Sequence, residues 1–229
     1  GLDPNNTFIN LVGTSNLDPD FLTQLHNIKY RGSTARIFFI LKSLPKIEGL
    51  DPNQMGTNFS ICPTIESLER ASDSVKYGKI SETPYVEFNI PSILNQDLTS
   101  DNKHILSATV QYAPYNLRDQ IWDDKSKSIL EKNTVQTIKS VIPNFSSLIE
   151  SSSILSPQDI ENEFGLKEGN LNHGEMTLDQ FMFMRPTISS SQYSTPIKNL
   201  YICGGGTHPG GGLHGANGYN AAKTILKIW

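Results

Sequence analysis

The sequence is poor in cysteine, in clustered positive charge and in long apolar runs, and each shortage excludes a class of protein. Its 229 residues include two cysteines, Cys62 and Cys203, which are too far apart in sequence for a disulfide framework or a metal site. No apolar run is long enough to cross a bilayer. The 19 basic residues are outnumbered by 23 acidic ones and are scattered, so nucleic-acid binding has no electrostatic basis. We expect no structural metal, no transmembrane segment and no nucleic-acid partner.

The rest of the composition is that of an ordinary globular chain. Hydrophobic residues make up 37% of the sequence, and the mean hydropathy is -0.33. The length suffices for one large domain or two small ones. The low cysteine content favours a reducing intracellular compartment, either the cytoplasm or an organellar matrix. The start of the chain shows no signal peptide, although a chain that begins within a longer protein would have lost one.

Apolar periodicity and capping residues predict alternating helices and strands. Helices are expected within residues 15–26, with Asp18 or Asp20 as the cap, and over 67–77, 126–142 and 216–226. Another helix should begin at the N-cap Ser156 and end at Gly165. Strands are expected over residues 35–41, 85–90 and 104–112. The polar stretches 51–58 and 95–103 read as surface loops. These elements predict an α+β domain built on a mixed or antiparallel sheet.

A dense group of glycines near the C-terminus is the strongest functional signal in the chain. Six of the 17 glycines lie between positions 204 and 212, after the apolar residues 200–203 and before the expected helix at 216. We predict a strand, a glycine turn and a helix start, a geometry in which backbone amides approach a ligand closely. A tight packing corner would give the same pattern.

Two common glycine motifs are excluded by what surrounds this turn. A P-loop needs Lys and Ser or Thr after its last glycine, whereas Gly212 is followed by Leu213 and His214. A dinucleotide fingerprint must open a full βαβ unit with an acidic residue about 20 positions later, and this chain ends at residue 229. The turn is therefore not the opening motif of a Rossmann domain.

Residues 165–228 resemble the C-terminus of the phytoene dehydrogenase-like flavoprotein family. The resemblance lies in the segment from His173 to Gln180, in Arg185-Pro186, in Thr195-Pro196 and in residues 200–222. It continues more loosely upstream, through residues 30–36, Trp122-Asp123 and 156–161. The family's N-terminal Gly-x-Gly-x-x-Gly segment is absent from this chain.

The resemblance implies a division of the chain and a cofactor. Residues 1–198 would form a substrate-binding region, and residues 199–229 would return to complete a Rossmann-like FAD-binding domain whose N-terminal part is absent. The amides of about Gly210 to Leu213 would approach the flavin and its ribityl-pyrophosphate. The residues expected at the cofactor are Gly204, Gly205, Pro209, Gly210, Gly211, Gly212, Leu213 and Gly215. With half of the FAD site missing, we expect the 229 residues alone to bind FAD weakly or not at all.

Several side chains have both a functional and a structural interpretation. His208 and His173 are weak catalytic candidates, and His208 is more simply explained by a local hydrogen bond that fixes the turn. The resemblance places Asp179, Gln180 and Arg185 near substrate or cofactor, although an ion pair between Asp179 and Arg185 explains them equally well. The apolar residues Met176, Phe181, Met182, Phe183 and Met184 are interpreted first as buried packing and second as the lining of a substrate tunnel. Cys203 is expected to be a small buried residue.

Three functions follow from these expectations. The first is the C-terminal part of an FAD-dependent oxidoreductase that transfers hydride between an apolar substrate and the flavin. The second is a non-catalytic module that binds lipid or protein on the same fold. The third is that this chain is inactive by itself and needs its own N-terminal FAD-binding half as a partner.

Overall fold

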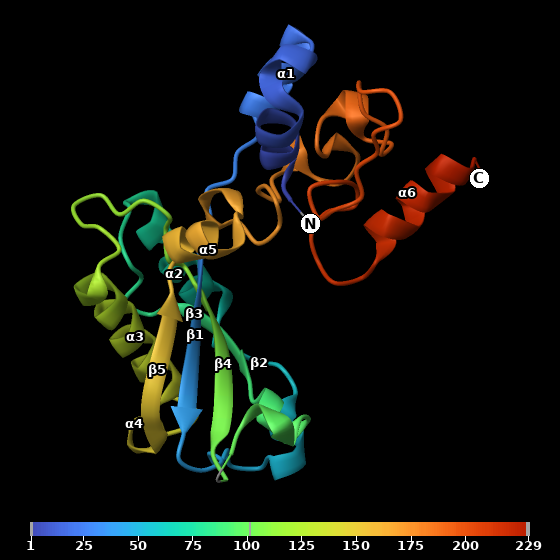
Figure 1. Ribbon diagram of the computed structural model, residues 1–229. Coiled ribbons are helices and arrows are strands. Elements are labelled where there is room, and N and C mark those ends of the chain that lie inside the picture. Colours follow the sequence, from blue (N-terminus) through green and yellow to red (C-terminus); the bar gives the residue numbers. More distant parts are fainter. Residues whose placement is uncertain (1, 101, 228–229) are drawn as a thin grey trace. The chain divides into compact units, whose positions relative to one another are not determined.

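The computed structural model describes residues 2–100 and 102–227 and divides them into two compact units. One unit consists of residues 33–159, and the other combines residues 1–32 with 160–229. Figure 1 shows the elements of both. Each unit is described by itself. Within the part of the chain that the structure describes, no helix combines the length and the apolar character needed to cross a membrane.

The unit of residues 33–159 is built on an antiparallel sheet of five strands in the order β2-β3-β4-β1-β5. The strands are β1 (Thr34–Leu41), β2 (Phe59–Ile61), β3 (Tyr85–Asn89), β4 (His104–Gln111) and β5 (Ile149–Leu155). The α+β expectation is confirmed, and the sheet is antiparallel rather than mixed. The strands β1, β3 and β4 are those that the alternating sequence predicts.

One face of this sheet carries the hydrophobic core. Alternate residues of β1, among them Ile37 and Phe39, are fully buried, because successive side chains of a strand point to opposite faces. Helices α3 (Asp124–Ile138) and α4 (Phe145–Leu148) contribute Leu130 and Phe145 to the same core. The rings of Phe39 and Phe145 meet edge to face, with centroids 5.2 Å apart. The other face of the sheet carries half-buried residues, including Arg36 and Phe38 on β1.

The remaining helices begin where capping residues place them. Helix α1 (Pro19–His26) is capped by Asp18, whose carboxylate accepts from the Asp20 amide at 2.8 Å. Helix α2 (Ile65–Lys76) is capped by Thr64. Helix α5 (Pro157–Phe164) starts after Ser156, which exchanges hydrogen bonds with Asp159. Helix α6 (Ala216–Leu226) follows the glycine turn. The end of the helix expected over 126–142 was wrong by four residues, since α3 stops at Ile138.

Short helical turns complete the chain. A π-helix spans Asn6–Gly13, and its Phe8 packs edge to face on Phe21 of α1 within a small apolar cluster. The 3-10 turns are Thr14–Asn16, Pro52–Gly56, Pro91–Ile93, Gln96–Leu98, Lys167–Gly169, Leu178–Gln180, Met182–Met184 and Ile188–Ser190.

The strand expected at residues 200–203 is not formed. A single antiparallel bridge between Ser194 and Tyr201 is the pairing that the structure gives this segment. A strand needs a neighbouring strand for its backbone donors and acceptors, and the five described strands all lie in the other unit. The expected completion of a Rossmann-like sheet is therefore not seen in the described residues.

Candidate functional site

The glycine turn adopts backbone conformations that side-chain-bearing residues rarely adopt. Gly210 and Gly212 have φ values of +129° and +116°, and Gly215 at the start of α6 has φ +69°. Glycine reaches this region without the steric cost that a Cβ imposes. The glycines at these three positions are thus explained by the path of the chain.

Other glycines of the turn are explained by close packing. A Cβ on Gly206 would stand 2.6 Å from the ring of Pro4, and one on Gly211 would collide with the side chain of Asn172. By contrast, a Cβ on Gly215 would meet nothing within 4 Å, and one on Gly204 would make ordinary contact. The turn therefore has a packed part around 206–211 and an open part at 212–215, where all four residues are exposed.

Asn217 holds the packed part of the turn, and sequence reasoning missed it. Its side-chain amide lies 3.0–3.2 Å from the carbonyl oxygens of four turn residues and from the Thr207 hydroxyl, and Asn217 is buried. The four carbonyls are those of Gly204, Thr207, His208 and Gly210. An asparagine in the first turn of a helix that follows six glycines is the signal that could have identified it, because turn carbonyls need a donor.

The first turn of α6 has free donor capacity. Its N-cap is Gly215, no side chain caps it, and its first turn contains no acidic residue. The Ala216 amide is paired with Nδ1 of His214 at 3.1 Å. The amides that open a helix carry partial positive charge and attract electron-rich groups. The open part of the turn and the start of α6 thus present amides next to exposed backbone.

His208 lies beside a cavity of about 400 Å³ that is lined by Phe183, Ser191, Gln192, Tyr193, His208 and Asn220. The His208 carbonyl accepts hydrogen bonds from the Tyr193 hydroxyl at 3.0 Å and from Asn217. Its ring Nδ1 is buried and has no hydrogen-bond partner. The main chain of His208 therefore fixes the turn, as expected, while its imidazole is left for another contact.

His173 is the second histidine at the turn. It has φ +56°, and its ring stands beside Gly205, where a Cβ would be 3.6 Å from the imidazole. Its Nδ1 is also buried without a partner. Burial lowers the pKa of His173 below its usual value, because desolvation disfavours the charged imidazolium. The folded protein therefore favours neutral His173.

Arg185 and Gln180 are turned toward the backbone. The Arg185 guanidinium is 3% exposed and donates to carbonyls of the loop 172–180, including Asn172 at 2.6 Å and Glu175 at 3.1 Å. Burial lowers its pKa. The Gln180 amide pairs with both main-chain polar groups of Lys29, at 3.1 and 2.7 Å. Their donors are engaged in holding the loop.

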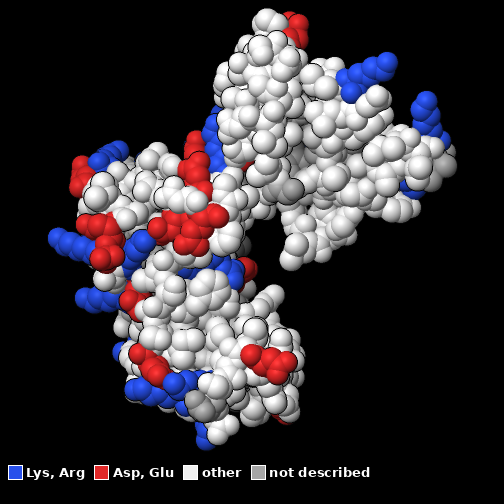
Figure 2. Space-filling model, viewed as in Figure 1, with Lys and Arg blue, Asp and Glu red and all other residues white. Residues whose placement is uncertain are grey.

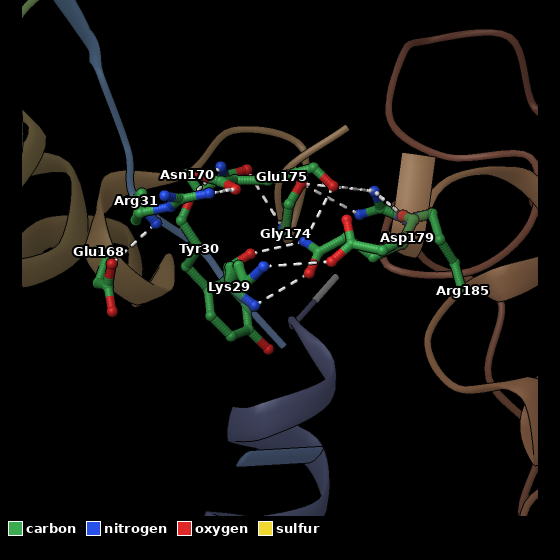
Figure 3. Close-up of polar contacts among 10 residues, drawn as sticks. Lys29, Tyr30, Arg31, Glu168, Asn170, Gly174, Glu175, Asp179 and Arg185 are labelled. Carbon is green, nitrogen blue, oxygen red and sulfur yellow. Dashed lines mark hydrogen bonds and ion pairs between the residues drawn. The ribbon is translucent and has the colours of Figure 1, made fainter. Parts of the chain in front are cut away.

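Figure 3 shows how this loop clamps the segment from Lys29 to Arg31. Asn170 donates to the Tyr30 carbonyl at 2.5 Å, and Glu168 accepts from the Arg31 amide at 2.8 Å. The Arg31 side chain pairs with Glu175. Asp179 pairs with Lys29 at 3.2 Å, so the expected ion pair between Asp179 and Arg185 was wrong. Asp179 remains largely exposed.

Two further expectations fail on exposure. The apolar stretch expected to be buried is open, with Met176, Met182 and Phe183 exposed by 42%, 44% and 67%. Cys203, expected inside a strand, is an exposed free thiol, as is Cys62. Both errors have the same cause, since the strand and core that would cover these residues are absent from the described chain. Within the described residues, no cluster of three or more His, Cys, Asp or Glu could hold a metal ion.

Comparison with known proteins identifies relatives of this chain. No protein-family model matches it. It is 34% identical over 233 aligned residues to pyridine nucleotide-disulfide oxidoreductase domain-containing protein 2 of Rattus norvegicus, which covers 98% of this chain and 40% of that protein. It is 44% identical over 69 residues to a limonene dehydrogenase polypeptide of Castellaniella defragrans, covering 28% of the chain and 13% of the relative. A 4,4'-diapophytoene desaturase of Staphylococcus haemolyticus is 25% identical over 148 residues, covering 62% of the chain and 28% of the relative.

Proposed function

Because the chain belongs to the phytoene dehydrogenase-like oxidoreductase family, with pyridine nucleotide-disulfide oxidoreductase domain-containing protein 2 among its relatives, we propose that it forms the C-terminal part of an FAD-dependent oxidoreductase. The chain spans 40% of the length of that rat relative. The proposed reaction of the whole protein is hydride transfer between an apolar substrate and the flavin. Limonene dehydrogenase and diapophytoene desaturase, two relatives in the same set, are named for apolar substrates.

The observation that carries the proposal is the open part of the glycine turn. Residues 212–215 are exposed, α6 begins there without a side-chain cap, and a Cβ on Gly215 would meet only empty space. A turn that served packing alone would have no need of glycine at an unobstructed position other than its φ. Exposed amides and open space suit the close approach of a phosphate or a flavin edge, so the residues present fit the group.

In this proposal the amides of Gly210 to Leu213 and the start of α6 hold the cofactor. Gly204, Gly205, Pro209 and Gly215 shape the same surface. The bound flavin would supply the hydride acceptor or donor. The cavity beside His208 adjoins this turn, and the unpartnered imidazole there is the side chain available to hold a proton. His173 is a weaker catalytic candidate, and Asp179, Gln180 and Arg185 are more directly accounted for by the loop they stabilise.

We also propose a division of labour within the protein. Residues 1–198 serve the substrate, and residues 199–229 pack on an N-terminal FAD-binding half. The chain alone should then bind FAD weakly or not at all. The two free thiols, Cys62 and Cys203, fit a reducing intracellular compartment, which stays a prediction.

A second candidate function is a non-catalytic module that binds lipid or protein. The observation that favours it is the exposed apolar stretch containing Met176, Met182 and Phe183, because large exposed apolar patches mark binding surfaces. Such a module would have no use for flavin. The presence or absence of flavin therefore separates the two functions.

The test is the visible absorption spectrum of the whole protein that carries this chain, purified after incubation with excess FAD. Gly215→Ala is compared with Gly49→Ala as a matched control. Both glycines have positive φ, +69° and +78°, and a Cβ on either would meet nothing within 4 Å. The backbone strain of the two variants is therefore similar, and only Gly215 lies at the proposed cofactor surface.

We expect flavin bands in the wild-type protein and in Gly49→Ala, and a clear loss of bound flavin in Gly215→Ala. Equal flavin content in the two variants would contradict the placement of the cofactor at this turn. A colourless wild-type protein would favour the non-catalytic module. The 229-residue chain measured alone should be colourless, and retained flavin would show that the N-terminal half is not required.

A further inference from the structure

Arg36 is a cation in the middle of a sheet face that has no other role so far. It lies on β1, on the face opposite the hydrophobic core, and in register with Thr109 of β4 and Leu155 of β5. It is half-buried. In the view of Figure 2, charged residues gather over α3 and α5 and near the ends of the strands, while the surface over the strands is mostly uncharged. An arginine in such surroundings normally has a carboxylate partner.

No carboxylate pairs with Arg36 among the residues that the structure describes. Its guanidinium donates instead to the hydroxyls of Thr109 and Ser107, the latter at 2.7 Å. It also stands 5.5 Å from the centroid of the Phe38 ring. Burial lowers the pKa of Arg36, and no neighbouring charge offsets that effect. The cation is held in place by neutral groups and keeps unneutralised charge.

The carboxylate that lies closest along the hydrogen-bonded rows is engaged elsewhere. Glu87 of β3 is the register partner of Thr109, and Thr109 is the register partner of Arg36. Glu87 and Arg36 are therefore two strands apart, roughly 9–10 Å at the usual strand spacing. The Glu87 carboxylate accepts from the Tyr85 hydroxyl at 2.6 Å. That hydrogen bond holds the acid on its own side of the sheet.

The two hydroxyls make Arg36 a better anion receptor than a lone cation. Ser107 and Thr109 use oxygen lone pairs to accept from the guanidinium, so each retains its own O–H hydrogen to donate. An oxygen anion above the sheet could then take a charge-assisted bond from the guanidinium and further bonds from the hydroxyls. A planar carboxylate matches the planar guanidinium particularly well.

The surface beside Arg36 is apolar along one direction. Phe38 and Ile40 follow it on the same face of β1, and Ile105 of β4 is the register partner of Ile40. All three are half-buried. From Arg36 to Ile40 the strand advances about 13 Å at 3.3–3.4 Å per residue. The face thus has a cationic head position and an apolar track of that length.

We propose that this face binds an amphipathic acid, with its carboxylate on Arg36, Ser107 and Thr109 and its apolar body along Phe38, Ile40 and Ile105. The site lies wholly within the unit of residues 33–159. As the substrate class of an oxidoreductase the inference rests on the proposed function, which it narrows from an apolar molecule to one that ends in a carboxylate. Binding of the acid itself requires no flavin.

The experiment is an NMR titration of the 229-residue protein with octanoate and, separately, with 1-octanol. The two probes share the alkyl chain and differ in the anionic head. We expect octanoate to bind at least tenfold more tightly than octanol and to shift the amides of β1 and β4. In Arg36→Gln, octanoate binding should fall about tenfold or more, the usual cost of losing a charge-assisted bond. Octanol binding should change little.

The matched control is Arg70→Gln, which removes an exposed arginine of α2 and should leave both affinities unchanged. Thr109→Val provides a second variant that keeps the guanidinium, and it should weaken octanoate several-fold. Equal wild-type affinity for octanoate and octanol would overturn the proposal, as would unchanged octanoate binding in Arg36→Gln. Because no flavin is present, failure here is distinct from failure of the cofactor test.

Discussion

The polar residues that stand out in the C-terminal sequence act mainly on the backbone. Arg185 satisfies carbonyls of the loop 172–180, Gln180 pairs with the Lys29 peptide, and Asn170 binds the Tyr30 carbonyl. Segments without regular secondary structure leave many buried carbonyls unpaired, and side chains with several donors are the means of satisfying them. A conspicuous arginine or glutamine in such a segment is therefore weak evidence for catalysis.

His173 gives this point a measurable consequence in the pH dependence of stability. Burial holds the pKa of its folded form below the ordinary value, so the unfolded state binds more protons in the window just below about pH 6.5. The free energy of unfolding should accordingly fall as the pH drops from 7.5 to 5.5. In His173→Gln this decrease should be smaller, as measured by urea unfolding at both pH values.

The control for that prediction is His26→Gln, which changes an exposed histidine at the end of α1. Its pH dependence should match the wild type. His104 is a second histidine whose pKa is lowered by burial, so some acid sensitivity should persist in His173→Gln. An identical pH profile for wild type and His173→Gln would show that His173 is not held neutral by the fold.

At the scale of elements, the join between the glycine turn and α6 depends on one amide. Replacing Asn217 by Asp keeps the shape but directs a carboxylate at the carbonyls of Gly204, Thr207, His208 and Gly210. We expect Asn217→Asp to lose about 2–3 kcal/mol of unfolding free energy at pH 7, the cost of buried acceptors left without a donor.

The sign of the pH effect distinguishes this mechanism from simple loss of packing. Among carbonyl oxygens the new carboxyl should have a raised pKa, so the loss should shrink as the pH falls through that raised pKa and the group gains a proton to donate. Asn95→Asp is the control, since Asn95 is an exposed cap where Asp serves equally well. A pH-independent loss in Asn217→Asp would argue against the amide's role as donor.

Elements with local signals were predictable from the sequence, and those that depend on distant partners were not. Asp18 and Ser156 mark the starts of α1 and α5 because capping is a contact within a few residues. Strand β5 was missed because three serines interrupt its apolar pattern, and it exists by pairing with β1. The strand expected at 200–203 failed for the converse reason, since an apolar run needs a neighbouring strand. Asn217 could not be recognised before the path of the turn was known.

At the scale of the whole molecule, the C-terminal segment leaves apolar side chains without cover. Leu213 is fully exposed, and Tyr219, Ile225 and Leu226 of α6 are exposed by 62%, 49% and 66%. Single exposed apolar residues are common, but several along one short segment indicate an interface. Together with the coverage of 40% of the rat relative, this exposure supports the proposed packing of residues 199–229 on an N-terminal half.

That packing predicts different effects of one substitution in the chain and in the assembled protein. Ile225→Glu should change the unfolding free energy of the 229-residue chain by no more than about 0.5 kcal/mol, because the side chain is half exposed and a surface change of this kind costs little. When the chain is co-expressed with the remainder of the protein as a separate polypeptide, the same change should sharply reduce the amount that copurifies. A charge buried without a partner at an apolar interface is strongly unfavourable. Ile65→Glu, at an 83% exposed position of α2, is the matched control and should copurify like the wild type. Equal recovery of both variants would mean that α6 is not an interface, and the exposed residues would then have to serve a ligand or a different partner.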